Sequence, residues 1–295
     1  MSAKLFYLDT SIWNALCDQQ VDAQTLISKL ADRNTRLVLG PNVVYELAKT
    51  FDTNKLGMPE RGRTLFAYLQ RFVRAEIPVF NEPAVLLRQE AARAAGEIDR
   101  VEVFWNEVNY SSLLSAVENL SQGEFDENAK LFIKNRKSAA RQTRFDMSGH
   151  LESRPALAQA LERVNEDSLR AWIDHEANGL GGRRVLQSQL AIVFERRPDR
   201  KLTLLSKKLL ANRRYRISHA LVRSALYLNW RSAHRGSIRS DVPDDAYHGV
   251  NACYCDVFVT TEPDQAFHAE LVNSNIRAIS YDEDVPLALW LPQIA

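Results

Sequence analysis

Carboxylates near both ends of this chain follow short hydrophobic runs, and they are the residues most able to do chemistry. Asp9 follows the run Lys4–Leu8, and Glu262 and Asp264 follow the run Val257–Thr260. Each run predicts a β-strand, and open α/β sheets place their sites at the carboxyl ends of such strands. Acids that gather there repel one another, and a divalent cation relieves that repulsion. The pattern indicates Mg²⁺ or Mn²⁺ chemistry on phosphate.

Two further acids lie in segments that predict helices. Glu46 follows the turn Gly40–Asn42, which places a proline at or near a helix start, and Asp245 lies where another helix begins. Asp244 is a rival for the role of Asp245, and one of the two is expected to be only a helix cap. His248, three residues after Asp245, is expected to hydrogen-bond an acid or the backbone rather than to bind metal.

The order of predicted elements gives the fold class, which is α/β. The first 57 residues predict strand, helix, helix, strand and helix, the stretch 58–240 is nearly all helical, and α/β character returns over 241–295. The prediction is a small parallel sheet built from both ends of the chain and split by a large helical insertion that packs on it. The expected strands are residues 5–8, 36–39, 257–259 and 276–279, with a short extended piece at 77–80.

Four segments resemble the PIN-domain family of metal-dependent ribonucleases, in the order that the family shows. They read LDTSIW at 8–13, VVYEL at 43–47, DAYH at 245–248 and YCDVFVTTE at 254–262. The resemblance implies a PIN-like core at 1–57 and 241–295 that binds Mg²⁺ or Mn²⁺ and cuts single-stranded or structured RNA. It implies catalytic and metal-binding roles for four acids and supporting roles for three hydroxyls: Asp9, Glu46, Asp245 and Glu262, with Thr10, Ser11 and Thr260.

The fourth acid departs from the family pattern, because Glu262 stands where the family usually has aspartate. The longer glutamate still reaches a metal directly or through water, and Asp264 is an alternative ligand. Asp256, at the other end of the same predicted strand, is expected to order the turn there.

The other candidates have simpler interpretations as well. Asp9 could be a helix N-cap, and Glu46 could be a solvent-facing helix residue. Thr10 or Ser11 could cap a helix that starts near Ile12.

Charge is unevenly distributed along a chain whose formal net charge is only +1. Residues 196–239 hold 13 Lys or Arg and one acid, whereas residues 241–295 hold 10 acids and one base. This polarity is typical of a metal site beside a track for a polyanion, although two solvated faces that pair with each other would give the same count. The expected RNA contacts, which could instead form a surface for a partner protein, are Lys134, Arg136, Lys137, Arg141, Lys207, Lys208, Arg213 and Arg214, with Tyr215 stacking on an unpaired base.

Other classes find no support in the sequence. Three cysteines, an odd number, suit a reducing compartment, and no window approaches the ~20 apolar residues of a membrane span. We therefore expect a cytoplasmic protein. No Ser-His-Asp arrangement, phosphate-binding loop or dinucleotide fingerprint is present.

The leading hypothesis is a metal-dependent endoribonuclease, which could be the toxin partner of an antitoxin protein and could form a homodimer. One alternative is a PIN-like protein that binds nucleic acid without cutting it. Another is a structural or regulatory protein whose insertion binds a partner.

Overall fold

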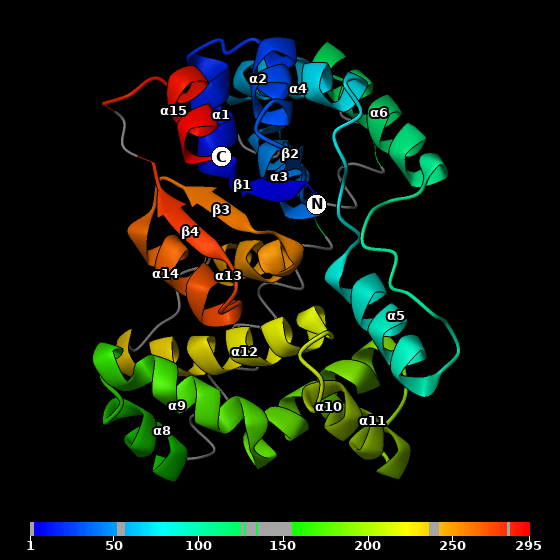
Figure 1. Cartoon of the computed structure of the whole chain (residues 1–295), viewed down its shortest axis with the longest axis vertical. Helices are drawn as coiled ribbons and strands as arrows, with labels where there is room; N and C mark the ends of the chain where they lie inside the picture. Colours follow the sequence, from blue (N-terminus) through cyan, green and yellow to red (C-terminus); the bar gives the residue numbers. More distant parts are fainter. Residues whose placement is uncertain are drawn as a thin grey trace.

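Four parallel strands form the sheet of this α/β protein (Figure 1). The computed structural model describes residues 3–51, 57–124, 155–235, 242–281 and 284–295, together with residues 127 and 134. The strand order is β2-β1-β3-β4, which confirms the predicted parallel sheet drawn from both ends of the chain. The strands are β1 (Lys4–Leu8), β2 (Thr35–Val38), β3 (Val257–Thr260) and β4 (Arg277–Ser280).

The central strand β1 joins the two ends of the sequence. Tyr7 pairs with Val38 of β2 on one side and with Phe258 of β3 on the other. Phe6, Tyr7 and Leu8 are completely buried, as is usual for a parallel sheet covered by helices on both faces. The carboxyl ends of β1 and β3 therefore meet, and Asp9 and Thr260 lie at that meeting point.

Helices cover the two faces of the sheet, as the alternation of strands and helices predicts. In Figure 1, α1, α2 and α15 lie above the strands, and α13 and α14 lie below them. The flanking elements are α1 (Thr10–Asp18), α2 (Ala23–Ala31), α3 (Pro41–Ala48), α13 (Val242–Asn251), α14 (Pro263–Val272) and α15 (Leu287–Ile294), with short 3₁₀ turns η1 (Lys49–Phe51) and η2 (Ala252–Tyr254).

The predicted extended piece at 77–80 forms only isolated bridges. Leu39 pairs with Val79, and Phe80 pairs with Phe104, so this segment continues the β2 side of the sheet without becoming a strand.

The described part of the predicted insertion is mainly helical, and its helices divide between two hydrophobic cores. Helices α4 and α6 share the core of the sheet, where Trp13 meets Phe72 edge to face at 5.0 Å. The remaining helices form a second core, to which α13 and α14 contribute Ala246, Val250 and Leu271. The helices are α4 (Met58–Arg74), α5 (Pro83–Ala95), α6 (Glu107–Gln122), α8 (Pro155–Glu162), α9 (Glu166–Asn178), α10 (Leu180–Val193), α11 (Arg200–Leu210) and α12 (Arg216–Arg235).

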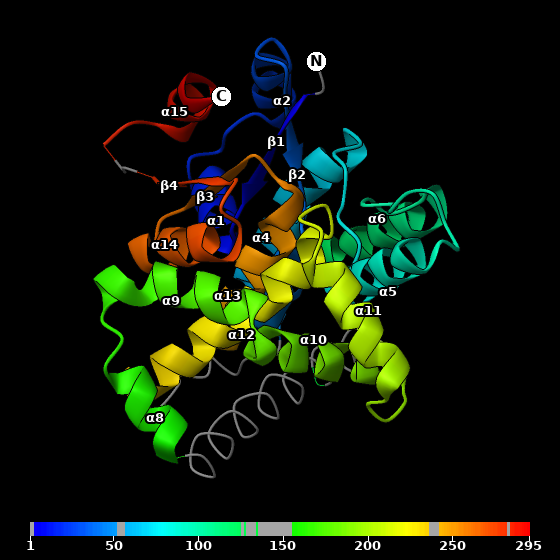
Figure 2. The ribbon, with the colours of Figure 1, turned by 60° about the horizontal axis from the view of Figure 1, so that its bottom comes forward.

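Helix α12 connects the two parts of the molecule. It runs beneath α13 and α14 and contacts α5, α8, α9 and α10 on its other sides (Figures 1 and 2). Among the helices that the structure describes, none is both long and apolar enough to cross a bilayer.

One buried carboxylate fastens this connection. Glu90 of α5 is fully buried and accepts hydrogen bonds from the backbone N–H groups of Ile217 and Ser218, both at 2.9 Å, in the first turn of α12. The Ser218 hydroxyl at 2.6 Å and the Tyr254 hydroxyl of η2 at 2.6 Å complete its set of donors. A carboxylate at a helix N-terminus is favoured by the helix dipole, so Glu90 joins α5, α12 and η2.

Candidate functional site

Asp9 lies at the carboxyl end of β1 and is 2% exposed. Its Oδ1 accepts hydrogen bonds from the Ser11 hydroxyl at 2.5 Å and from the Ile12 N–H at 3.1 Å, and its Oδ2 accepts one from the Thr260 hydroxyl at 2.5 Å. Burial raises the pKa of Asp9, although the charge of His248 and these hydrogen bonds oppose the rise. The prediction that Thr10 or Ser11 caps α1 was wrong, because the helix begins at Thr10. Asp9 is the N-cap of α1, which confirms the alternative interpretation of this residue.

Glu46 of α3 is linked by hydrogen bonds to α1 and to α13. The Thr10 hydroxyl, next to Asp9 in the chain, donates a short hydrogen bond to Glu46 Oε2. The same oxygen lies 3.0 Å from Nε2 of His248. The side chain of Glu46 is only 16% exposed, which excludes the solvent-facing alternative. Burial alone would raise the pKa of Glu46, but the charge and hydrogen bond of His248 outweigh it and lower the pKa to about 2.

His248 of α13 is 2% exposed and hydrogen-bonds an acid, as predicted. Its other ring nitrogen, Nδ1, lies 2.9 Å from the hydroxyl of Tyr7 on β1. Tyr7 was not predicted from the sequence as a site residue. The residue type at position 40 is linked to Tyr7, because a Cβ there would lie 2.3 Å from the Tyr7 hydroxyl. A glycine directly before Pro41 leaves the room that the Tyr7 ring needs.

The third predicted acid, Asp245, belongs to α13, one helical turn before His248. The side chains of Asp245 and its rival Asp244 lie outside the described residues.

Glu262 and Asp264 are exposed where α14 begins. Two hydrogen bonds hold the turn before α14 close to Asp9. The N–H of Thr261 donates to the Ser11 hydroxyl at 3.1 Å, and the N–H of Glu262 donates to the Thr260 hydroxyl at 3.0 Å. Asp256, at the other end of β3, accepts a 2.8 Å hydrogen bond from the N–H of Leu5, which confirms its predicted structural role.

Carboxylate oxygens are ligands that Mg²⁺ and Mn²⁺ prefer, and Asp9 and Glu46 provide them at one edge of the sheet. Within the described part of the chain, no group of three or more His, Cys, Asp or Glu side chains is placed to hold a metal ion. Mg²⁺ is commonly bound by one or two carboxylates together with waters and substrate phosphate, so a site needs no more than two carboxylates from the protein.

Known proteins add nothing to the assignment. No family model matches the chain, and no curated protein or solved structure is significantly similar to it.

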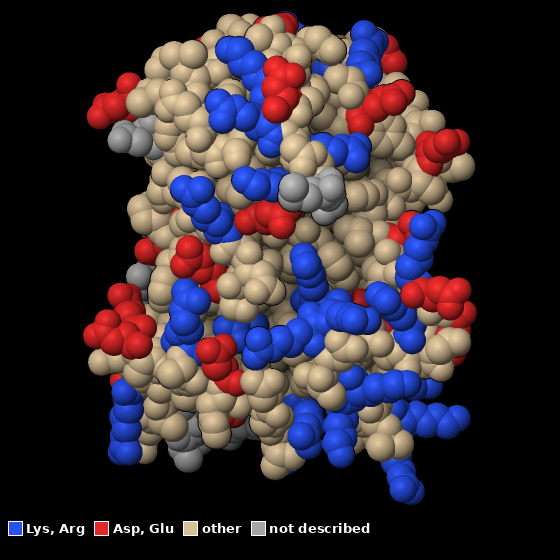
Figure 3. All heavy atoms as spheres, viewed as in Figure 1, with Lys and Arg blue, Asp and Glu red and all other residues tan. Residues whose placement is uncertain are grey.

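The predicted RNA contacts are placed unequally. Lys134, Lys207, Arg213 and Arg214 are exposed, whereas Arg136, Lys137 and Arg141 lie outside the described residues. Lys208 donates its ammonium to the carbonyl of Ala94 at the C-terminal end of α5. Tyr215 is 8% exposed within the second core, so its predicted stacking role was wrong: a base cannot reach a ring that neighbouring side chains cover. Figure 3 shows Lys and Arg gathered over the lower half of the face, where Figure 1 places α5 and α10 to α12.

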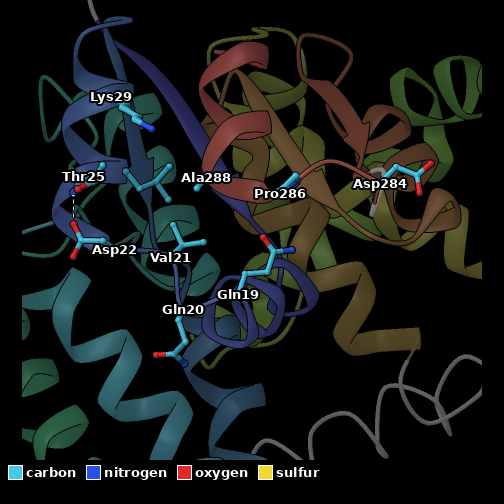
Figure 4. A pocket seen from close by; sticks show the side chains of 10 residues that line it. Gln19, Gln20, Val21, Asp22, Thr25, Lys29, Asp284, Pro286 and Ala288 are labelled. Carbon is cyan, nitrogen blue, oxygen red and sulfur yellow. Dashed lines mark hydrogen bonds between the residues drawn. The ribbon is translucent and has the colours of Figure 1, made fainter.

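A surface hollow of about 640 Å³ lies elsewhere, between the end of α1, helix α2 and the segment before α15 (Figure 4). Its lining includes Gln19, Asp22, Lys29 and Asp284 and none of the predicted site residues. Gln19 accepts a hydrogen bond from the N–H of Leu287 at 2.8 Å, so it helps to hold α15 in place.

The low pKa of Glu46 predicts an acid-sensitive contribution to stability. A carboxyl whose pKa falls from 4.5 to about 2 on folding stabilises the protein above the unfolded pKa and loses this effect as pH falls toward 2. The quantity to compare is the unfolding free energy of wild type minus that of Glu46→Gln. We expect this difference to fall by roughly 2–3 kcal/mol as the pH is lowered from about 5 to 2. Urea denaturation across this range measures it. Glu97→Gln, at an exposed glutamate after α5, is the control. If the unfolding free energies of wild type and Glu46→Gln depend on pH in the same way, the contact with His248 does not lower the pKa of Glu46.

Proposed function

We propose that this protein is a metal-dependent endoribonuclease with a PIN-like site at the carboxyl edge of its sheet. The observation that carries the proposal is the hydrogen-bonded chain from Thr10, the residue directly after Asp9, to Glu46 and His248. Two neighbouring buried acids have pKa values shifted in opposite directions, which is common at functional sites and costly to maintain in a purely structural role.

Each residue has a defined task in this proposal. Asp9, Glu46 and Asp245 would hold Mg²⁺ or Mn²⁺ together with a non-bridging oxygen of the scissile phosphate, and Glu262 or Asp264 would complete the set. When bound, such an ion lowers the pKa of a water and stabilises charge at phosphorus and at the leaving oxygen. Ser11 and Thr260 fix the two oxygens of Asp9 by hydrogen bonds.

His248 keeps Glu46 in position and balances its charge, while Tyr7 holds the other side of the imidazole ring. The exposed bases Lys207, Arg213 and Arg214 would contact RNA phosphates without reading sequence, so binding would weaken steeply as salt rises.

Cleavage of labelled single-stranded RNA, structured RNA and single-stranded DNA, each in Mn²⁺, Mg²⁺ and EDTA, tests the proposal. We expect the protein to cut RNA with either metal and not in EDTA. Salt-sensitive binding of RNA without cutting under any condition would favour the second candidate function, a protein that binds nucleic acid without cleaving it. The observation that favours this second candidate is that position 262 holds an exposed glutamate.

A further inference from the structure

Helices α10 and α11 form a strongly basic hairpin that is anchored to α5. Residues 180–214 contain ten Lys or Arg and two acids. The guanidinium of Arg88 on α5 donates to the carbonyl of Val193 at 3.0 and 2.6 Å, and Lys208 donates to the carbonyl of Ala94. Each contact places a cation at the C-terminal end of a helix, where the dipole favours it. The hairpin is therefore held in a fixed position, and the connection 194–199 forms its exposed tip.

The backbone at the tip is defined by a Schellman motif. The N–H of Arg196 donates to the carbonyl of Ala191, and the N–H of Glu195 donates to the carbonyl of Ile192, both at 3.0 Å. Glu195 has φ +51°, a left-handed conformation that costs a residue other than glycine some free energy. Phe194, directly before it, is thus presented by an ordered turn.

The ring of Phe194 is exposed among cations. It is 39% exposed, and the guanidinium carbon of Arg196 lies 5.7 Å from the ring centroid. Arg197 and Arg200 are exposed nearby in the chain. Of the two acids at the tip, Glu195 is exposed, and Asp199 caps α11 through the N–H of Leu202 at 2.7 Å and lies 4.0 Å from the guanidinium of Arg196. An accessible aromatic ring with one arginine over it and further exposed arginines next in the chain is a combination with which proteins bind unpaired nucleotides.

We propose that this tip binds an unpaired base of single-stranded RNA, with the base stacked on Phe194 and the flanking phosphates on Arg196, Arg197 and Arg200. The choice of RNA rests on the proposed function. A membrane surface fits less well, because insertion requires a continuous apolar face. Ile192, which is 68% exposed, is an apolar residue near Phe194 in the chain, but Glu195, Arg196 and Arg197, which follow Phe194, are charged and exposed. Phe194 takes over the stacking role that the buried Tyr215 cannot perform.

Binding of the full-length protein in EDTA, where metal-dependent cutting is absent, tests this inference by fluorescence anisotropy. The probes are a labelled single-stranded oligouridylate and a labelled RNA duplex of the same length. We expect Phe194→Leu to weaken oligouridylate binding roughly 5- to 100-fold and duplex binding much less, because paired bases cannot stack on the ring. Phe267→Leu on α14, at a phenylalanine that is 36% exposed, is the matched control and should bind both probes like wild type.

Equal affinity of Phe194→Leu and wild type for oligouridylate would overturn the inference, as would equal losses on both probes. Binding of wild type to vesicles of anionic phospholipid, lost in Phe194→Leu without any change toward RNA, would show that the tip binds membranes instead. If wild type cuts RNA but Phe194→Leu binds it normally, only this inference fails. If wild type binds neither RNA probe, the proposed function fails as well.

Discussion

Asp9→Asn will slow RNA cleavage about 100- to 1000-fold while the protein stays folded. In the proposed site the carboxylate of Asp9 holds the divalent ion, whose stabilisation of the transition state is worth several kcal/mol. Asparagine is as good a helix N-cap as aspartate, so the start of α1 is kept. Because burial raises the pKa of Asp9, a neutral side chain is tolerated here, but the asparagine NH₂ group meets a hydroxyl that donates to Asp9, so we expect a modest loss of stability that leaves the protein folded. Single-turnover cleavage and thermal melts measure the two effects separately.

Asp256→Asn is the matched control for Asp9→Asn. Its carboxylate accepts a hydrogen bond from Leu5 at the opposite end of the sheet, so the substitution should leave the cleavage rate within a few-fold of wild type. Full activity of Asp9→Asn, or a loss that only follows the fraction of unfolded protein, would contradict the assignment of Asp9.

Glu90→Ala will lower the unfolding free energy by about 3–5 kcal/mol. The substitution leaves four donors without their acceptor. Three are buried, namely the N–H groups of Ile217 and Ser218 and the Ser218 hydroxyl, and the fourth is the hydroxyl of the half-buried Tyr254. Breaking a buried, fully hydrogen-bonded charge site carries a cost of this size. Urea denaturation followed by circular dichroism measures the change.

Glu97→Ala, at an exposed glutamate just after the same helix, controls for the loss of one acid and should change the unfolding free energy by less than about 0.5 kcal/mol. Glu90→Gln should fall between the two, since its amide oxygen still accepts hydrogen bonds while its NH₂ group meets donors. Stability of Glu90→Ala close to that of wild type would show that Glu90 does not join α5 to α12.

The elements were predictable because their signals are local. Hydrophobic runs that stop at Asp9 and after Thr260 give β1 and β3, and Gly40-Pro41 marks the start of α3. Parallel pairing follows from the helices between the strands. The division of the insertion between two cores was not predictable. The apolar stripes on α4 and α12 indicate that each helix packs on something, but they do not indicate which neighbours it packs against.

The site was predictable only in part. Asp9 and Glu46 follow from their place after strands and from the family resemblance, and the structure brings them together through Thr10. The pairing of His248 with both Glu46 and Tyr7 depends on how α13 packs against α3 and β1, which no local pattern encodes. The burial of Tyr215 was not predicted for the same reason. The sequence around a tyrosine flanked by arginines is the same whether its ring is exposed to solvent or packed in a core.

Titration of the metal-free protein with Mn²⁺ in a calorimeter tests the central claim most directly, because it requires no knowledge of the substrate. The claim is that Asp9, Glu46 and Asp245 bind one cation. We expect a single site in wild type, with affinity lowered at least about tenfold in Asp9→Asn, Glu46→Gln and Asp245→Asn and unchanged in Asp256→Asn. Absence of Mn²⁺ binding in wild type, or equal binding in all four variants, would contradict the account.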